Sequence, residues 1–388
     1  METWGERVRR EVDAKVGEGK LADAAERLEH LLAEAAPGEG ALLPAWMRLA
    51  GLRRALRQPQ RALEAVHHAL TIAPLDFTAL VMRASLLERL APDDAGRAWH
   101  EALACRPDGP LPPPLAQAVA QGEAVHAAWS AARADRLEQA ITPLCGGLED
   151  DRAWRIRRLR DNVLRRTRPY RSSPTHFHYP ALTEREFHPP ARFEWLEHFN
   201  AAAPAIRAEF EQLMASGRAE LLPYLQYDDR EALAQWRELN RNPDWTAVHL
   251  LRGGERVAAN ADACPQTMAL LERVQQPVIP GASPNAMFSL LAPHTVIPPH
   301  VGVNNTRLLC HVPLIVPPGC WFRVGAETRP WREGEAFVFD DTIEHEASNP
   351  TDHLRVVMIF DIWHPDLDPL EQEAVAAIVA QESVAGDL

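Results

Sequence analysis

The stretch from Ser289 to Pro365 constrains the fold of this chain more than any other. Short runs of β-branched and aromatic residues alternate there with turns rich in glycine, proline, asparagine and aspartate. Strands are predicted at Cys320–Val324, Ala336–Phe339 and His353–Asp361. Many short strands separated by such turns are typical of antiparallel sheets in a barrel or jelly roll.

Three chemically active side chains are placed within this pattern. His300 ends a loop stiffened by prolines, and His345 lies in a second loop about 45 residues later, before a polar turn predicted at Ser348–Asp352. Arg355 follows on a predicted strand. Two neutral imidazoles can hold a divalent iron and leave positions open for oxygen and a chelating co-substrate. A guanidinium inside a barrel can bind the distal carboxylate of a dicarboxylic acid such as 2-oxoglutarate. The usual third ligand, a carboxylate two residues after the first histidine, is replaced by Gly302.

Three motifs in this region, at residues 299–314, 331–346 and 361–366, together resemble the aspartyl/asparaginyl β-hydroxylases. Members of that family are double-stranded β-helix oxygenases that use iron(II), 2-oxoglutarate and oxygen. The resemblance extends from about His176 to Leu370, roughly half of the chain. The family lacks the metal-binding carboxylate, so Gly302 matches its pattern.

The resemblance implies a role for each of six residues. It implies His300 and His345 as iron ligands, Arg355 with Ser289 as the clamp on one end of 2-oxoglutarate, His311 as a contact to the other end, and Arg307 as a lining residue of the same pocket. An alternative for His311, which lies between apolar neighbours, is a hydrogen-bonded core histidine. Some members carry an arginine two residues before the equivalent of His311, where this chain has Leu309.

Acidic and basic residues around the second histidine have no implied catalytic role. Asp340, Asp341, Glu344 and Glu346 are expected to hold the loop, to orient the His345 imidazole or to receive a cationic group of the substrate. Arg323 and Arg329 are candidates to face substrate, and the segment Trp363–Pro365 is expected to pack and turn.

The first hundred residues show the apolar spacing of amphipathic helices at residues 24–32, 61–70 and 95–103. They also repeat: Ala62, Ala69, Leu70 and Pro74 recur 33 residues later as Ala95, Ala102, Leu103 and Pro107. This pattern resembles the tetratricopeptide repeat, in which stacked helix pairs leave a concave face for a partner. The alternative is a plain α-helical bundle.

The predicted fold class is therefore a multidomain α+β chain. An all-α, tetratricopeptide-like repeat domain is expected at residues 1–145, a basic helical linker at 146–175, and a double-stranded β-helix (jelly-roll, cupin-like) domain with flanking helices at 176–388. Further helices are predicted at residues 115–141, 193–199, 205–214, 264–272 and 370–379, and a strand at 244–254. The basic segment Arg155–Arg171 fits an acidic partner, a domain junction or a solvated helix face.

Composition narrows the setting in which the chain works. Its net charge of −13 disfavours nucleic acid and anionic membranes as partners. The first residues lack the apolar core of a signal peptide, and the 5 cysteines are scattered and odd in number, as reduced thiols in a cytoplasmic protein would be.

These observations predict an iron(II)/2-oxoglutarate-dependent dioxygenase. It is expected to hydroxylate the β-carbon of an aspartyl or asparaginyl residue in a peptide or protein that the helical repeats engage, with succinate and CO2 as co-products. The main alternative is a non-catalytic scaffold whose repeats bind a partner and whose barrel is sensory or degenerate. A third possibility is a cupin-like metalloenzyme that does not use 2-oxoglutarate.

Overall fold

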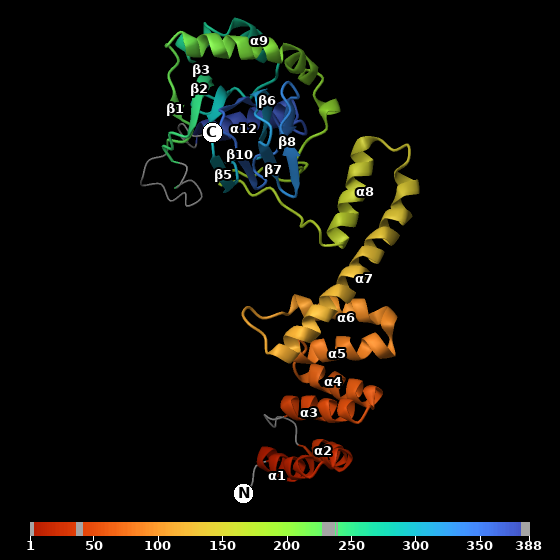
Figure 1. The fold of residues 1–388 in the computed structure, drawn as a ribbon. Helices are drawn as coiled ribbons and strands as arrows, with labels where there is room; N and C mark the ends of the chain where they lie inside the picture. The colour runs from red at the N-terminus through yellow and green to blue at the C-terminus, as the bar shows by residue number, and fades with distance from the viewer. Residues whose placement is uncertain (1–3, 36–41, 227–236, 238–239, 382–388) are drawn as a thin grey trace. The chain divides into compact units, whose positions relative to one another are not determined.

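The chain forms two compact units, Met1–Leu164 and Arg165–Leu388, in the computed structural model shown in Figure 1. The structure describes residues 4–35, 42–226, 237 and 240–381. The segment 146–175, predicted as a linker, is divided between the two units.

The first unit is built from consecutive helices that each pack against the next. They are α1 (Trp4–Gly17), α2 (Leu21–Glu34), α3 (Leu42–Ala55), α4 (Pro59–Ile72), α5 (Phe77–Leu90), α6 (Pro92–Ala104), α7 (Pro113–Cys145) and α8 (Asp150–Val163). The helices predicted at residues 24–32, 61–70, 95–103 and 115–141 correspond to α2, α4, α6 and α7. This stack is consistent with the tetratricopeptide-like repeat.

Small residues at the repeat positions allow these helices to approach closely. Ala24, Ala62 and Ala95 are all buried. A Cβ on Gly96 would lie 2.1 Å from Cγ of Trp129, so only glycine lets the indole of α7 rest on α6. The repeat read from the sequence is therefore a packing pattern.

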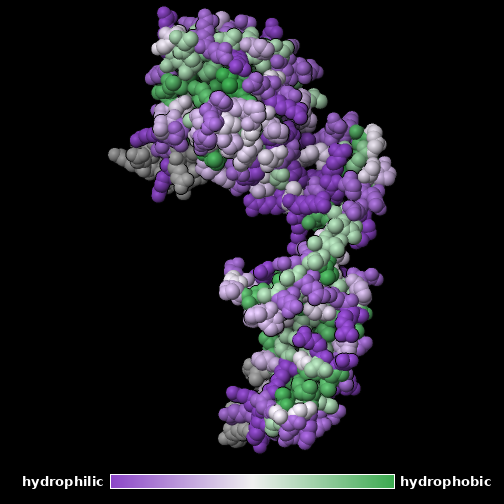
Figure 2. Space-filling model, viewed as in Figure 1, coloured by the Kyte–Doolittle hydropathy of each residue, from purple (hydrophilic) through white to green (hydrophobic). Residues whose placement is uncertain are grey.

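The basic segment Arg155–Arg171 begins within helix α8 and makes contacts inside the first unit. Arg160 of α8 forms ion pairs with Glu138 and Asp161, and the Arg158 guanidinium lies 5.2 Å from the centroid of Trp154. In the view of Figure 2 the surface around α8 is largely hydrophilic. Part of the segment is thus a solvated helix face.

The second unit is a sandwich of two antiparallel sheets. Among the described residues the larger sheet has seven strands in the order β1-β2-β4-β11-β6-β9, with β3 paired to β2, and the smaller has four in the order β5-β10-β7-β8. The strands are β1 (Leu222–Pro223), β2 (Trp245–Arg252), β3 (Glu255–Arg256), β4 (Ala286–Leu291), β5 (Thr295–His300), β6 (Arg307–Ile315), β7 (Trp321–Val324), β8 (Glu327–Pro330), β9 (Phe337–Phe339), β10 (His345–Asn349) and β11 (Arg355–Trp363). The jelly-roll fold class is confirmed.

The two faces of the larger sheet pack against different elements. Its outer face packs against α9 (Leu196–Ala215), where Phe199 stacks on Phe360 with ring centroids 4.8 Å apart. Its inner face, which includes Trp245 and Met287, faces the smaller sheet in a second core. Three other helical segments belong to this unit: α10 (Ala258–Ala261), α11 (Pro265–Leu271) and α12 (Pro369–Gln381), together with the short 3-10 helix η1 (Pro190–Arg192).

The structure corrects three local predictions. The loop ending at His300 is strand β5, and Ser348 and Asn349 of the predicted polar turn end strand β10. Prolines are tolerated in β5 because, among the described strands, it lies at the edge of its sheet and pairs with β10 alone. The two helices predicted at 193–199 and 205–214 form one helix, α9, which continues through Pro204.

Among the described residues, no helix is both long and apolar enough to span a lipid bilayer.

Candidate active site

A cavity opens between the two sheets of the second unit, and all six predicted site residues line it. These are Ser289, His300, Arg307, His311, His345 and Arg355. They come from five strands, so only the folded sandwich brings them together. Apolar side chains, among them Met287, Ile297, Phe322 and Ile359, fill much of the wall between them.

The two histidines meet where β5 ends and β10 begins. His300 and His345 are register partners, and their ring centroids lie 4.0 Å apart. Nδ1 of His300 lies 2.7 Å from the Pro298 carbonyl oxygen, and Nδ1 of His345 lies 3.1 Å from that of Ile343. Because a carbonyl only accepts, Nδ1 carries the proton in each neutral ring, and Nε2 bears the lone pair.

Burial keeps both imidazoles neutral. It lowers the pKa of His300 well below its usual value, with a further contribution from His345. Burial also lowers the pKa of His345 to about 4, although hydrogen bonds to backbone carbonyls oppose the shift. A neutral imidazole whose Nδ1–H is held by a hydrogen bond is the form of histidine that binds a divalent metal.

The space beside Gly302 is occupied by the carboxylate of Asp341. A Cβ on Gly302 would lie 2.2 Å from Oδ2 of Asp341, so the Asp341 side chain occupies the space beside this glycine. Oδ2 of Asp341 is 3.3 Å from Nη2 of Arg307, and its Oδ1 is buried without a hydrogen-bond partner among the described residues. Across the described part of the chain, no group of three His, Cys, Asp or Glu side chains is arranged to hold a metal ion. A metal here would thus rely on two histidines.

Arg355 presents unsatisfied donors to the cavity. Its side chain is 2% exposed at the start of β11, and within the described residues its Nε and Nη1 have no hydrogen-bond partner. Burial lowers its pKa to about 10, so it is still charged at neutral pH. A buried cation with free donors requires an anion. The buried Ser289 hydroxyl, which accepts a 3.1 Å hydrogen bond from Trp245 Nε1, lies two register positions away along the neighbouring strand.

His311 packs among aromatic side chains and also lines the cavity. Its ring stacks on Trp331 at 13° with centroids 5.6 Å apart, as a core aromatic would, yet it lines the cavity. Burial, then Arg355 and His345, lowers its pKa well below the usual value. Its Nδ1 has no hydrogen-bond partner in the described part of the chain. Leu309, the departure noted in the sequence, also lines the cavity.

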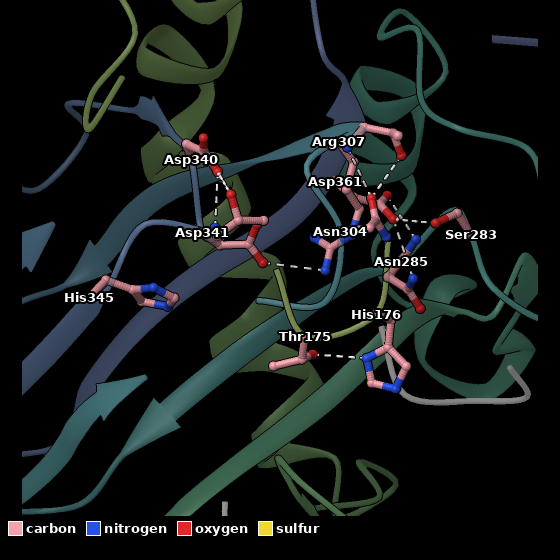
Figure 3. Close-up of polar contacts among 12 residues, drawn as sticks. Thr175, His176, Ser283, Asn285, Asn304, Arg307, Asp340, Asp341, His345 and Asp361 are labelled. Atoms are coloured by element: carbon pink, nitrogen blue, oxygen red, sulfur yellow. Dashed lines mark hydrogen bonds and ion pairs between the residues drawn. The ribbon is translucent and has the colours of Figure 1, made fainter. Parts of the chain in front are cut away.

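The structure adds an acidic residue to the site that the sequence reasoning passed over. Asp361 is 1% exposed and lines the cavity, and its carboxylate accepts hydrogen bonds from Ser283 Oγ (2.8 Å) and the Asn285 backbone N–H (2.9 Å). Figure 3 shows these groups beside Arg307, with Asp341 between them and His345. The signal was available, because residues 355, 357, 359 and 361 alternate along one strand face.

Other residues near the second histidine have structural tasks. Arg323 pairs with Glu344 and Glu346, and the Arg329 guanidinium lies 3.8 Å from the Phe187 ring centroid. Neither arginine lines the cavity. Asp340 accepts from the Thr342 hydroxyl at 2.5 Å and so shapes the turn before His345.

Comparison with known proteins places these residues in context. The family model described as Aspartyl/Asparaginyl beta-hydroxylase matches residues 200–365. The chain is 36% identical over 154 residues to human aspartate beta-hydroxylase domain-containing protein 2, covering 38% of this chain and 42% of that protein. It is 35% identical over 151 residues to mouse aspartyl/asparaginyl beta-hydroxylase, covering 38% of this chain and 20% of that protein.

A bacterial relative matches a longer segment. The ornithine lipid ester-linked acyl 2-hydroxylase of Rhizobium tropici is 34% identical over 194 residues, covering 49% of this chain and 65% of that protein. This chain thus spans less than two thirds of the length of each of these relatives. Among solved structures, an oxidoreductase of the 2OG-Fe(II) oxygenase family from Burkholderia pseudomallei matches with a TM-score of 0.29 and 13% identity, covering 48% of this chain and 95% of that one.

Proposed function

Through residues 200–365 the chain belongs to the aspartyl/asparaginyl β-hydroxylase family, and we propose that its sandwich unit is an iron(II)/2-oxoglutarate-dependent dioxygenase. The observation that carries the proposal is the pairing of two neutral, buried histidines with an anion-seeking arginine in one cavity. The two histidines fit a divalent metal, and the arginine fits the carboxylate of a co-substrate.

Each side chain would contribute binding or placement. His300 and His345 would hold the metal through Nε2, with Nδ1 fixed by backbone carbonyls. Arg355 and Ser289 would bind the distal carboxylate of 2-oxoglutarate, and His311 would contact its other end. When bound, iron(II) and 2-oxoglutarate supply oxygen activation and the two electrons that balance hydroxylation, with succinate and CO2 as co-products.

The surrounding residues would set the electrostatics of the reaction. The Arg307–Asp341 ion pair places one charge of each sign beside the histidines, at 6% and 5% side-chain exposure. Aromatic walls at Phe322, Trp331 and Phe339 would exclude water, which strengthens these interactions.

The proposed substrate is the β-carbon of an aspartyl or asparaginyl residue in a peptide or protein. The names of the mouse and human relatives described above support the choice of a β-carbon, and the name of the Rhizobium protein indicates a lipid acyl chain as the substrate of that relative. The stacked helices of the first unit would engage such a polypeptide. The working setting we propose is the cytoplasm.

Turnover of 2-oxoglutarate tests the proposal. We expect the purified chain with iron(II) to release succinate without added substrate, and Arg355→Gln to raise the 2-oxoglutarate concentration at half-maximal rate by roughly 100-fold or more, since one partner of a buried charged contact is lost. Arg329→Gln is the matched control, because that arginine lies outside the cavity. A folded wild type that binds iron but forms no succinate would favour the scaffold alternative. Turnover with unchanged 2-oxoglutarate dependence in Arg355→Gln would contradict the clamp.

A further inference from the structure

The cavity contains a second group of basic side chains, at the end of the sheet opposite Arg355. His249 and Arg252, both on β2, line the same cavity. In the register of the larger sheet His249 pairs with Met287, which pairs with Ile359, which pairs with His311. His249 therefore faces inward, in the same row as His311.

His249 is separate from the co-substrate clamp, although it shares a row with His311, because strands β4 and β11 lie between the two histidines. Leu291 of β4 is the register partner of both Arg355 and Trp245, so Arg355 shares a row with Trp245. His249 follows Trp245 by four positions on β2. At about 3.3 Å per residue the two rows are roughly 13 Å apart along the sheet. One small dicarboxylic acid clamped at Arg355 would not also occupy His249.

The neighbouring polar side chains in the cavity have hydrogen-bond or ion-pair partners within the protein. The comparable contacts of His249 and Arg252 are missing among the described residues. The other cavity arginine nearby, Arg307, is paired with Asp341, and Asp361 already accepts from Ser283 and Asn285. Within the described residues, Nδ1 of His249 is buried without a hydrogen-bond partner, and Arg252 forms no ion pair. Arg252 is exposed at the end of β2, where the β2–β4 register shifts between His249 and Leu251.

Electrostatics define what these two residues would bind. Burial, and then the neighbouring Arg252, lowers the pKa of His249 to about 4. The pair therefore offers one permanent positive charge and a neutral ring that can donate one hydrogen bond. This combination suits a carboxylate or phosphate, and the Arg252 charge repels a cationic group.

We propose that His249 and Arg252 form a substrate-recognition site for an acidic group that is distinct from the group being oxidised. The preferred substrate would then be an extended molecule with a carboxylate or phosphate beyond its reacting carbon, such as a polypeptide with an acidic residue next to the target residue. This proposal rests on the proposed function for the meaning of "substrate", but the binding site is defined by the cavity alone.

Calorimetric titration of the full chain with matched peptides tests it. The probes are N-acetyl-Asp-Glu-amide, N-acetyl-Asp-phosphoserine-amide and the neutral N-acetyl-Asp-Gln-amide, added with 2-oxoglutarate present and oxygen absent. We expect wild type to bind at least one acidic probe about 10-fold or more tightly than the glutamine probe. Arg252→Gln should reduce this preference to within about twofold, and Arg252→Glu should reverse it. His249→Phe should weaken the acidic probes alone.

Two controls keep the test specific. Arg256→Gln alters an exposed arginine on the adjacent β3 that pairs with Asp262 and lies outside the cavity, so it should retain the preference. Equal affinity of wild type for all three probes, including no binding of any, would overturn the proposal. So would an equal loss of affinity for all probes in Arg252→Gln. Binding of 2-oxoglutarate, measured by the same method, should be unchanged in these variants. If wild type did not bind 2-oxoglutarate, that result would count against the proposed function instead.

Discussion

At the scale of single residues, the second unit buries many polar side chains, and most of them have a hydrogen-bond or ion-pair partner. Asp341 pairs with Arg307, and Asp361 accepts from Ser283 and Asn285. Most of the buried side-chain atoms without a hydrogen-bond partner among the described residues of this unit belong to residues that line the cavity, as at Arg355. Unsatisfied buried donors cost stability, so their concentration there indicates a binding function.

His188 is an exception that predicts a pH effect on stability. It is 3% exposed, and neither ring nitrogen has a hydrogen-bond partner among the described residues. Burial, then His364 and Arg192, lowers its pKa to about 3. Between about pH 6.5 and 3 the unfolded chain therefore binds a proton that the folded chain does not, and the free energy of unfolding falls as the pH falls.

We expect His188→Phe to remove this contribution, which is at most about 1.4 kcal/mol per pH unit. Urea denaturation at pH 7, 6 and 5 would show a shallower decline than in wild type. His353→Phe, which alters an exposed histidine, should follow the wild-type slope. Identical slopes in His188→Phe and wild type would show that the pKa of His188 is the same in the folded and the unfolded chain.

At the scale of elements, helix α9 supports the site from behind the larger sheet. Besides packing on Phe360, it sends the buried Glu209 to the start of α11. The Glu209 carboxylate accepts from the backbone N–H groups of Gln266 (2.7 Å) and Thr267 (2.9 Å) and from the Thr267 hydroxyl (2.6 Å). It thus supplies the cap that Cys264, at the N-cap position of α11, does not.

Glu209→Ala should therefore lower the free energy of unfolding of the second unit by about 2–4 kcal/mol, because it leaves two buried donors of Thr267 and a partly buried donor of Gln266 unpaired. Glu211→Ala, on the same helix but exposed and paired only with Arg207, should change it by no more than about 0.5 kcal/mol. Chemical denaturation compares the two. Equal effects would mean that solvent, rather than Glu209, satisfies the start of α11.

Strand periodicity was sufficient to predict β2, β7, β9 and β11, and the pattern of His300, His345 and Arg355 was sufficient to predict three residues that line one cavity. It was insufficient for β5 and β10. These strands carry prolines and polar residues, and they are strands because of partners far away in the sequence. The same reason hid His249 and Arg252, whose position in the cavity depends on the β2–β4 register. The position of the Asp341 side chain beside Gly302 depends on the conformation of a turn, which no local sequence pattern specifies.

At the scale of the whole molecule, the two units have separate hydrophobic cores. Leu28 and Leu49 belong to a core of the first unit, and Phe288 and Met358 to a core of the second. A helical stack and an antiparallel sandwich also differ in how their contacts are distributed along the chain. We therefore expect two unfolding transitions.

Scanning calorimetry of the full chain tests this expectation. Leu28→Ala and Phe199→Ala each truncate a fully buried side chain, at a cost of roughly 2–5 kcal/mol. The first should lower only one transition temperature and the second only the other. A single transition lowered by both variants would show that the units unfold together.

The central claim is that His300 and His345 hold an iron that 2-oxoglutarate chelates beside Arg355. Anaerobic titration with iron(II) and 2-oxoglutarate, followed by visible absorption, tests it most directly through the weak metal-to-ligand charge-transfer band of such a chelate. We expect the band in wild type and in His353→Ala, a control at an exposed histidine, and its loss in His345→Ala. Absence of the band from folded wild type, or its persistence in His345→Ala, would contradict iron binding by these two histidines.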